Sequence, residues 1–424
     1  MKDKLIYEKF PLATLFLIVY FASIIKSTLR SPIVIVSSVL LIGYFFICCK
    51  FSIFVGSFTK GWIITLIVIF LSMLVNGFDK FYLLFYINCT LFLLLYGNNS
   101  LSWAEWSINI IAFMGVFYAV FTIIQVTMPS FYTAYVAPIM NTNSTFDPLR
   151  FMRFGIYSGF TYQTAVNALY LAMGIGASFT KLLFPKRNKW VNVSSIVIEL
   201  ICILLSAKRG HIVFVALSIL VVAFINSSRS KKFSTVLKIV VGIFLLMITA
   251  YYFVPSASYF FEHTFNYGDD ISNGRINMYL SAIELFKAHP FLGIGWEQFK
   301  YHYTKYSNVH NIYLQLLCET GIIGTTVFLT VFISGIMITI KQINTSINES
   351  LAFEKKILTF SMYCQLFFLI YGLTGNGLYD YYVLFFYFFA ILIMVKTRYK
   401  INSICVSNLK LRNIEEPSES ELNN

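Results

Sequence analysis

SINIIAFMGVFYAVFTIIQVT, residues 107–127, is an apolar run that contains no charged side chain. A helix needs roughly 20 mainly apolar residues to cross the hydrocarbon core of a bilayer. The run lacks the two-residue alternation of a membrane β-strand, and an unbroken apolar run indicates a helix. The stretch therefore predicts a transmembrane helix.

Runs of the same kind recur along the whole chain, although several are short for a span. The predicted spans cover residues 11–25, 32–49, 61–75, 81–96, 107–127, 158–182, 190–206, 211–226, 235–254, 311–340, 357–373 and 381–396. We therefore expect an all-α polytopic membrane protein with about 12 transmembrane helices and a large structured extracytoplasmic loop between spans 9 and 10.

The composition supports this class. Of the 424 residues, 58% are hydrophobic and 12% are charged, whereas an average soluble domain has about 45–50% apolar and about 25% charged residues. A soluble globule could not cover so much apolar surface, and the same apolar content excludes a disordered chain. The seven cysteines form no CxxC pair, and most lie inside apolar runs, so they indicate core residues rather than disulfides or metal ligands.

The net charge of +13 would suggest nucleic-acid binding in a soluble chain. Here most Lys and Arg residues lie in short loops between apolar runs, where basic residues set membrane topology. A cytoplasmic N-terminus places 21 of the 32 basic residues inside, including clusters at 185–189, 228–232 and 396–400. We therefore expect both termini in the cytoplasm and no nucleic-acid partner.

This orientation divides the chain into segments. They are helices 1–5 (1–127), an extracytoplasmic loop (128–157), helices 6–9 (158–254), a large extracytoplasmic loop (255–310), helices 10–12 (311–396) and a cytoplasmic tail expected to be disordered (397–424). Loops longer than about 12–15 residues are usually functional or disordered. The large loop is rich in aromatic residues and contains a helical apolar pattern at 276–288. The predicted apolar face of this helix carries Ile276, Tyr279, Leu280, Ile283 and Phe286. We expect a structured lid.

Some basic residues on the predicted outer side lie next to span ends or in the large loop, against the general charge bias. They are Arg150, Arg153, Lys208, Arg209 and Arg275. Charges near the membrane are costly unless they reach the interface or pair with another group. These residues either extend to the membrane surface or form a cationic cluster that binds an anion, most simply a phosphate.

His310 stands at the boundary between the large loop and the tenth predicted span. Histidine titrates near neutral pH and acts as a general base when a partner fixes its tautomer. Asn311, Gln315 and Glu319 follow it at helical spacing. Glu319 is then an orienting partner of His310, a hydrogen-bonding group or a solvated cap, and the sequence leaves these alternatives open. Glu199 lies inside the seventh predicted span, and no chemistry is assigned to it.

The stretch from Asn273 to Thr325 contains three motifs. They are GR at 274–275 before an amphipathic helix, HPFLGIGWEQF at 289–299, and HN at 310–311 followed by nine residues and GIIGT at 321–325. This stretch resembles the core of the O-antigen ligase and polymerase superfamily. Upstream, RFGIYSGFTYQTAVNALYL at 153–171 resembles the Arg-x-x-Gly segment of that family, which leads into a span. SAKRG at 206–210 is similar to its Ser-x-Ser-Arg turn, from which Ala207 and Lys208 depart.

The resemblance implies a glycosyltransferase of lipid-linked glycans that acts at the outer face of the bacterial cytoplasmic membrane. Its donor and acceptor would be undecaprenyl-diphosphate-linked oligosaccharides, and it would use no metal or other cofactor. His310 would be the base for the acceptor hydroxyl, and Arg209 and Arg275 would stabilise the leaving diphosphate. The expected substrate-binding residues are Arg153, Lys208, Asn311, Glu319 and Trp296.

The resemblance leaves more than one activity open. A polymerase of a surface polysaccharide (O-antigen, capsule or exopolysaccharide) is the first hypothesis, because such proteins occur wherever these polymers are made. The alternative is an O-antigen ligase that transfers polymer to lipid A-core. A transporter with twelve helices is the third, but it predicts related halves, which the sequence does not show. Membrane lipids, a chain-length regulator and a flippase are further expected partners.

Overall fold

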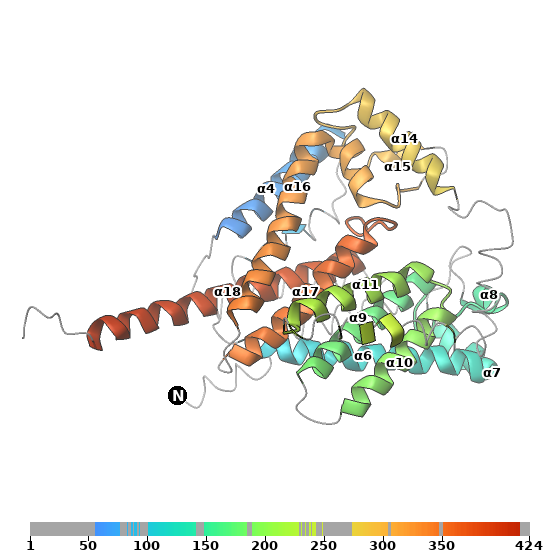
Figure 1. Cartoon of the computed structure of the whole chain (residues 1–424). Coiled ribbons are helices and arrows are strands. Elements are labelled where there is room, and N and C mark those ends of the chain that lie inside the picture. Colours follow the sequence, from blue (N-terminus) through green and yellow to red (C-terminus); the bar gives the residue numbers. More distant parts are fainter. Residues whose placement is uncertain are drawn as a thin grey trace, which may run out of the picture.

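The computed structural model describes residues 56–76, 101–140, 148–184, 189–228, 274–303, 307–346 and 351–415, with scattered positions in 83–93 and 230–248. The predicted spans at 11–25 and 32–49, most of those at 81–96 and 235–254, and loop residues 255–273 lie outside the described residues. All regular structure in the described ranges is helical, as the sequence predicts (Figure 1).

The α-helices of these ranges are α4 (Ser57–Asn76), α6 (Ser102–Thr127), α7 (Pro129–Phe131), α8 (Pro148–Met152), α9 (Thr164–Leu183), α10 (Lys189–Leu205), α11 (Arg209–Asn226), α14 (Arg275–Ala288), α15 (Phe299–His302), α16 (Ile312–Thr345), α17 (Ala352–Tyr371) and α18 (Tyr381–Glu415). By length and composition, α4, α6, α9, α16 and α18 are able to cross a membrane. Helices α10, α11 and α17 coincide with predicted spans but are shorter or more charged. The chain is thus a multi-pass membrane protein, and the count of about twelve spans stays a prediction.

Helix α9 lies at the centre of the bundle, with α6, α10, α11 and α17 packed around it. Small residues let these helices approach closely, since a Cβ added to Gly174 would lie 2.6 Å from the Cα of Gly115 on α6. Glu199 of α10 is buried beside this contact, where its carboxylate accepts a hydrogen bond from Ser195 at 3.2 Å. The partner of Glu199 among the described residues is therefore a hydroxyl of its own helix.

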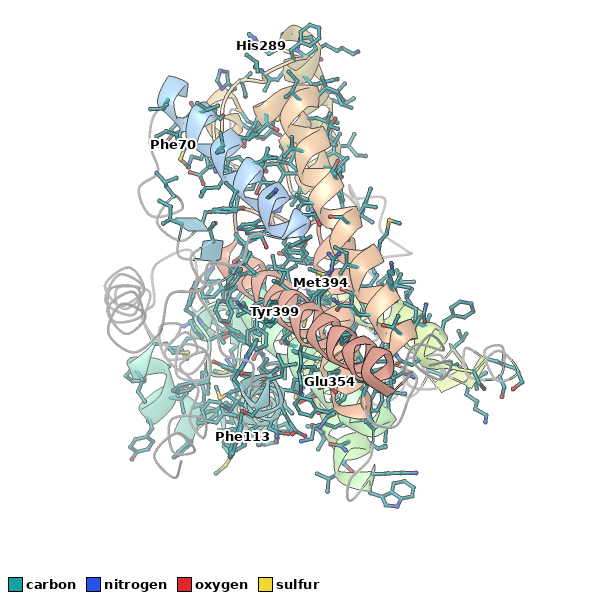
Figure 2. The ribbon with its side chains drawn as sticks, turned by 90° about the vertical axis from the view of Figure 1, so that its left-hand side faces the viewer. Phe70, Phe113, His289, Glu354, Met394 and Tyr399 are labelled. Atoms are coloured by element: carbon teal, nitrogen blue, oxygen red, sulfur yellow. The ribbon has the colours of Figure 1, made fainter. Side chains whose placement is uncertain are left out.

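Several lysines that the sequence assigns to the cytoplasmic side meet carboxylates at one end of the bundle. Lys356 of α17 pairs with Glu105 of α6 at 2.8 Å, and Lys400 of α18 pairs with Glu354 of α17 at 2.7 Å. Lys181, near the end of α9, lies within electrostatic reach of Lys356 and Glu105. Figure 2 shows Glu354 next to α18. These three lysines therefore lie at one end of the bundle, and the side of the membrane that this end faces stays a prediction.

Helix α18 differs from the last predicted span. Its apolar part, from Tyr382 to Val395, is buried against α16 and α17. The helix then continues past residue 396, the predicted end, to Glu415, because the polar stretch contains Lys, Arg and Leu, which favour helices. The segment expected to be disordered is thus helical up to Glu415, and in Figure 1 it extends away from the bundle.

Helix α14 confirms the predicted helix at 276–288, but the apolar face that the sequence predicts is not the side that is most buried. Met278 and Ala282 are the buried positions, whereas Ile276, Leu280 and Ile283 are exposed. The helix packs against α16 through the side that carries Met278 and Ala282. Figure 1 shows α14 and α15 together beside one end of α16, apart from the α6–α9–α10 layer.

Candidate functional site

The connections that carry most predicted site residues lie together at the end of the bundle opposite the paired lysines. The His211 ring at the start of α11 lies 5.5 Å from the ring of Tyr371, which ends α17 at its far side from Lys356. The turn before α11 contains Lys208, and Leu205 beside it accepts a hydrogen bond from the Tyr157 N–H at 3.0 Å. The loop after α8 and the α10–α11 turn therefore meet.

The start of α16 joins the same region. The Ile312 N–H donates to the Gly372 carbonyl at 2.9 Å, which ties α16 to the connection between α17 and α18. The Tyr279 hydroxyl of α14 donates to the carbonyl oxygens of His310 at 3.3 Å and Leu373 at 3.5 Å. Three segments that are distant in sequence thus surround His310.

His310 is held by an asparagine from the α17–α18 connection. Its backbone lies in the left-handed region, with φ of 58°. Its N–H donates to Oδ1 of Asn376 at 2.8 Å, and its ring Nδ1 lies 3.2 Å from Nδ2 of the same amide. The backbone carbonyl of Asn376 in turn accepts hydrogen bonds from the backbone N–H groups of Tyr379 and Asp380, each at 2.8 Å. The Asn376 side chain therefore holds His310 at two points, its backbone N–H and its ring Nδ1.

Two cations share this region with the imidazole. The pKa of His310 is lowered to about 4, first by burial and then by the positive charges of Arg275 and Lys208. The pKa of Lys208 is also lowered, by burial first and by Arg275 second. Because Arg275 acts on both His310 and Lys208, and Lys208 acts on His310, the three side chains lie within electrostatic reach of one another. No carboxylate among the described residues forms an ion pair with Arg275 or Lys208.

The backbone explains the position of Arg275. Gly274 caps α14 in the left-handed region, with φ of 78°, which glycine adopts without a steric penalty. The chain therefore turns sharply before the helix, and Arg275 becomes its first residue. The Gly-Arg motif thus supplies both the turn and the cation that follows it.

The structure does not place the other two predicted arginines, Arg209 and Arg153, next to His310. Arg209 opens α11 directly after Lys208, and its side chain lies outside the described residues. Arg153 follows α8 and is exposed, and the structure does not join it to His310 or Arg275. The glycine-containing turn after Arg153 instead anchors the loop, because Gln125 of α6 accepts from the N–H groups of Ser158 and Gly159 at 2.9 and 2.8 Å.

The glycine motifs form a backbone joint. Helix α16 is interrupted at Gly321, with φ of 61°. The 289–299 loop replaces the lost helical hydrogen bonds, since the Ile294 and Gly295 N–H groups donate to the carbonyls of Cys318 and Glu319 at 2.8 and 2.9 Å, and the Ile322 N–H donates to the Pro290 carbonyl at 2.8 Å. The structure shows a loop docked into a helix break.

Glu319 is a structural residue in this joint, which corrects its predicted contact with substrate. Its side chain is fully buried, with 0% exposure. The carboxylate accepts from the N–H groups of Glu297 at 2.9 Å and Phe299 at 3.1 Å, from Nε2 of Gln315 at 3.1 Å, and from the Tyr379 hydroxyl. All its acceptor capacity is used within the protein, and the orienting partner of His310 is Asn376 instead.

Trp296 and Asn311 likewise have structural contacts. The Trp296 ring is 1% exposed and stacks on Tyr379 at 4.7 Å and on Phe328 at 5.8 Å, so it packs in the core rather than facing a sugar. Asn311 is the N-cap of α16, and its side chain accepts from the N–H groups of Tyr313 and Leu314 at 3.0 and 3.1 Å. Trp296 therefore supports the joint at the helix break, and Asn311 supports the start of α16.

Asn376 was not predicted from the sequence. It lies in GLTGNGLYD at 372–380, where nothing in its spacing from His310 indicates a contact. One signal was present, since the topology places the connection between spans 11 and 12 on the same side as the large loop. A polar side chain in that short connection was therefore a candidate neighbour of His310.

Comparison with known proteins adds an independent finding. Residues 193–329 match the model of a family described as O-antigen ligase. A comparison with curated proteins found no match. The matched range runs from α10 into α16 and includes Lys208, Arg275 and His310 as well as the joint at Gly321. The matched third of the chain is therefore similar to the O-antigen ligase family.

Proposed function

We propose that this protein is a polymerase of a bacterial surface polysaccharide. It transfers the growing glycan from undecaprenyl diphosphate to a hydroxyl group of a lipid-linked repeat unit. The observation that carries the proposal is the meeting of Arg275, Lys208 and His310 at the end of the bundle opposite the paired lysines. By the positive-inside rule that end faces away from the cytoplasm.

The chemistry of the cluster suits this substrate. Nucleotide sugars are confined to the cytoplasm, so a sugar donor at the outer face has to be carried on lipid, and its leaving group is a diphosphate. Arg275 and Lys208 would bind that diphosphate and stabilise the charge that develops when the glycosidic phosphate bond breaks. A preorganised cation in a partly buried site is more effective than one in water. Arg209 is the third cation that we assign to this task.

An O-antigen ligase is the alternative, because the same cations serve a donor of the same chemistry. The glycan phenotype of a deletion strain separates the two activities. A polymerase mutant attaches one repeat unit to its final carrier and makes no long chains. A ligase mutant accumulates full-length polymer on undecaprenyl diphosphate. Unchanged surface glycan in the deletion strain would contradict both assignments.

The proposal places the protein in the cytoplasmic membrane with both termini inside. A cysteine introduced at Asn424 and another in the 372–380 connection test this topology by labelling intact cells with a membrane-impermeant maleimide. We expect labelling in the connection and none at the C-terminus. The chain has seven native cysteines, so the labelling is measured against the unmodified chain.

A further inference from the structure

The amide of Asn376 has only one orientation that satisfies its contacts with His310. A backbone N–H is a donor and nothing else, so the Asn376 atom that lies 2.8 Å from the His310 nitrogen has to be the carbonyl oxygen Oδ1. The amide nitrogen Nδ2 then faces the imidazole Nδ1 at 3.2 Å. Because Nδ2 is a donor, Nδ1 is the acceptor of this hydrogen bond.

This contact decides which nitrogen of the ring carries the proton. In neutral imidazole one nitrogen is protonated and the other accepts. With Nδ1 accepting from Asn376, the proton of the neutral ring is on Nε2. A base at Nε2 would need its proton on Nδ1, where it would face the amide protons of Asn376. Turning the amide by half a turn would place its two protons against the His310 N–H. Both alternatives therefore lose a hydrogen bond.

The surroundings keep the ring neutral. The charged or titratable side chains that face His310 are Arg275 and Tyr279 from α14 and Lys208 from the turn before α11. The Tyr279 hydroxyl donates to the His310 carbonyl and does not bind the ring. Burial and the two cations lower the pKa of His310 to about 4. Near neutral pH the cluster therefore presents donors alone: a guanidinium, an ammonium and an Nε2–H group. Such a set suits phosphate oxygens.

We propose that Asn376 is a positioning residue that holds His310 as the Nε2–H tautomer, so that the imidazole donates a hydrogen bond to the leaving diphosphate. This rests on the proposed function. In the transfer step the bond between the anomeric carbon and the diphosphate oxygen breaks, and its electron pair stays on the diphosphate. The acceptor hydroxyl oxygen forms the new bond to that carbon, and its proton passes to an oxygen of the released diphosphate. His310 then differs from the base that the sequence suggests.

Asn376→Asp tests this role because it reverses the tautomer. A carboxylate still accepts from the His310 N–H, but it also accepts from Nδ1–H and raises the pKa of the ring. Nε2 becomes an acceptor near pH 8 and a donor again when the ring is protonated at lower pH. Turnover of undecaprenyl-diphosphate-linked repeat units, extracted from a strain that lacks the gene, should fall at least tenfold at pH 8 and recover toward pH 6. If His310 were a base, the variant would keep its activity at pH 8 and lose it on acidification.

Asn308→Asp is the matched control. It adds the same charge two positions before His310, and its carboxylate keeps accepting from Nε2 of Gln315, as Asn308 does at 3.2 Å. It should keep the pH profile of the unmodified enzyme. A second pair of variants avoids Asn376 altogether. The amide of His310→Gln can donate but cannot take up a proton, so this variant should keep at least tenfold more turnover than His310→Ala. Equal activity of the two would overturn the role as donor.

The tautomer is also measurable without substrate. The chain has five histidines, and the ¹⁵N signals of His310 are assigned by their loss in His310→Gln. We expect a neutral ring with a protonated Nε2 at pH 7, and a changed tautomer in Asn376→Asp. Protonation of Nδ1 in the unmodified protein would overturn the inference. If the unmodified protein makes no polymer from the lipid-linked units, the proposed function fails together with the diphosphate as partner of His310, whereas the ¹⁵N spectrum decides the tautomer by itself.

Discussion

The joint between the 289–299 loop and the break in α16 gives a sharp prediction for Gly293→Ala. Gly293 has φ of 70°, and a Cβ built on it would lie 2.5 Å from the backbone nitrogen of Thr320. A residue with a Cβ costs about 1–2 kcal/mol in the left-handed region. Forcing a further carbon into a packed site costs about 1–3 kcal/mol more, and here the neighbour is backbone, which does not move aside easily. We expect a total destabilisation of about 2–5 kcal/mol.

Gly155 provides the matched control. Its φ is 67°, close to that of Gly293, but a Cβ built on it meets nothing within 4 Å. Gly155→Ala therefore carries only the backbone cost of about 1–2 kcal/mol. The difference between the two variants isolates the steric overlap in the joint. Gly321→Ala should resemble Gly293→Ala, because its Cβ would lie 2.6 Å from the backbone nitrogen of Leu292.

Thermal unfolding of the purified protein in detergent measures the effect. From the usual unfolding entropy per residue, 1 kcal/mol shifts the Tm of a chain of this length by roughly 1 °C. We expect Gly293→Ala to lower the Tm by about 2–5 °C and Gly155→Ala by about 1–2 °C. The double variant of Gly293 and Gly321 should lose less than the sum of the single losses, because both substitutions open the same joint. Equal Tm values for Gly293→Ala and Gly155→Ala would refute the docked loop.

Three further predictions concern the residues of the site. Glu319→Gln replaces one carboxylate oxygen by an NH₂ group, which would face the side-chain donor of either Gln315 or Tyr379, depending on how the amide is turned. Because a donor would then face a donor, the variant should lower stability by about 1–3 kcal/mol in the same unfolding assay. Because the pKa of His310 in the folded state is depressed to about 4, protonation disfavours the folded state. The Tm of the unmodified protein should therefore fall relative to that of His310→Gln as the pH drops from about 6.5 toward 4. A constant difference in Tm would contradict this. Arg275→Lys should reduce polymer formation at least tenfold, since an ammonium does not replace a bidentate guanidinium, while Arg398→Lys on α18 should leave the chain-length distribution unchanged.

The helical class could be predicted from the sequence because it depends on local composition. Apolar runs mark the helices, and basic residues between them mark one side of the bilayer. The pairing of Lys356 with Glu105 agrees with that topology. The end of α18 could not be predicted in this way, since hydropathy reports where the membrane ends and not where a helix ends. The exposure of the apolar face of α14 could not be predicted for a related reason. An apolar stripe on a helix in a membrane protein can face lipid as well as core.

The candidate site was predicted only in part, because the same motif holds two kinds of residue. Arg275 lies within electrostatic reach of His310, and their roles in catalysis stay predictions. Glu319 and Trp296 stand between them in the same motif, yet both are buried and hold the joint together. A motif spacing reports that positions are fixed, and it does not distinguish a contact with substrate from a contact with backbone. Asn376 lies outside the motif, and only the fold brings it to His310.

The break in α16 links these two kinds of residue physically. An unbroken helix of this length, 34 residues, would span about 51 Å, well beyond the 30 Å of a hydrocarbon core. The interruption at Gly321 lets the first turns of α16 follow a different direction from the rest of the helix, and the 289–299 loop fixes that direction through backbone hydrogen bonds. His310 precedes those first turns directly, and its backbone is bound by Asn376 and Tyr279. The position of the imidazole relative to Arg275 therefore depends on a glycine contact that touches neither residue, so loosening the joint should impair the cluster even when every charged side chain is intact.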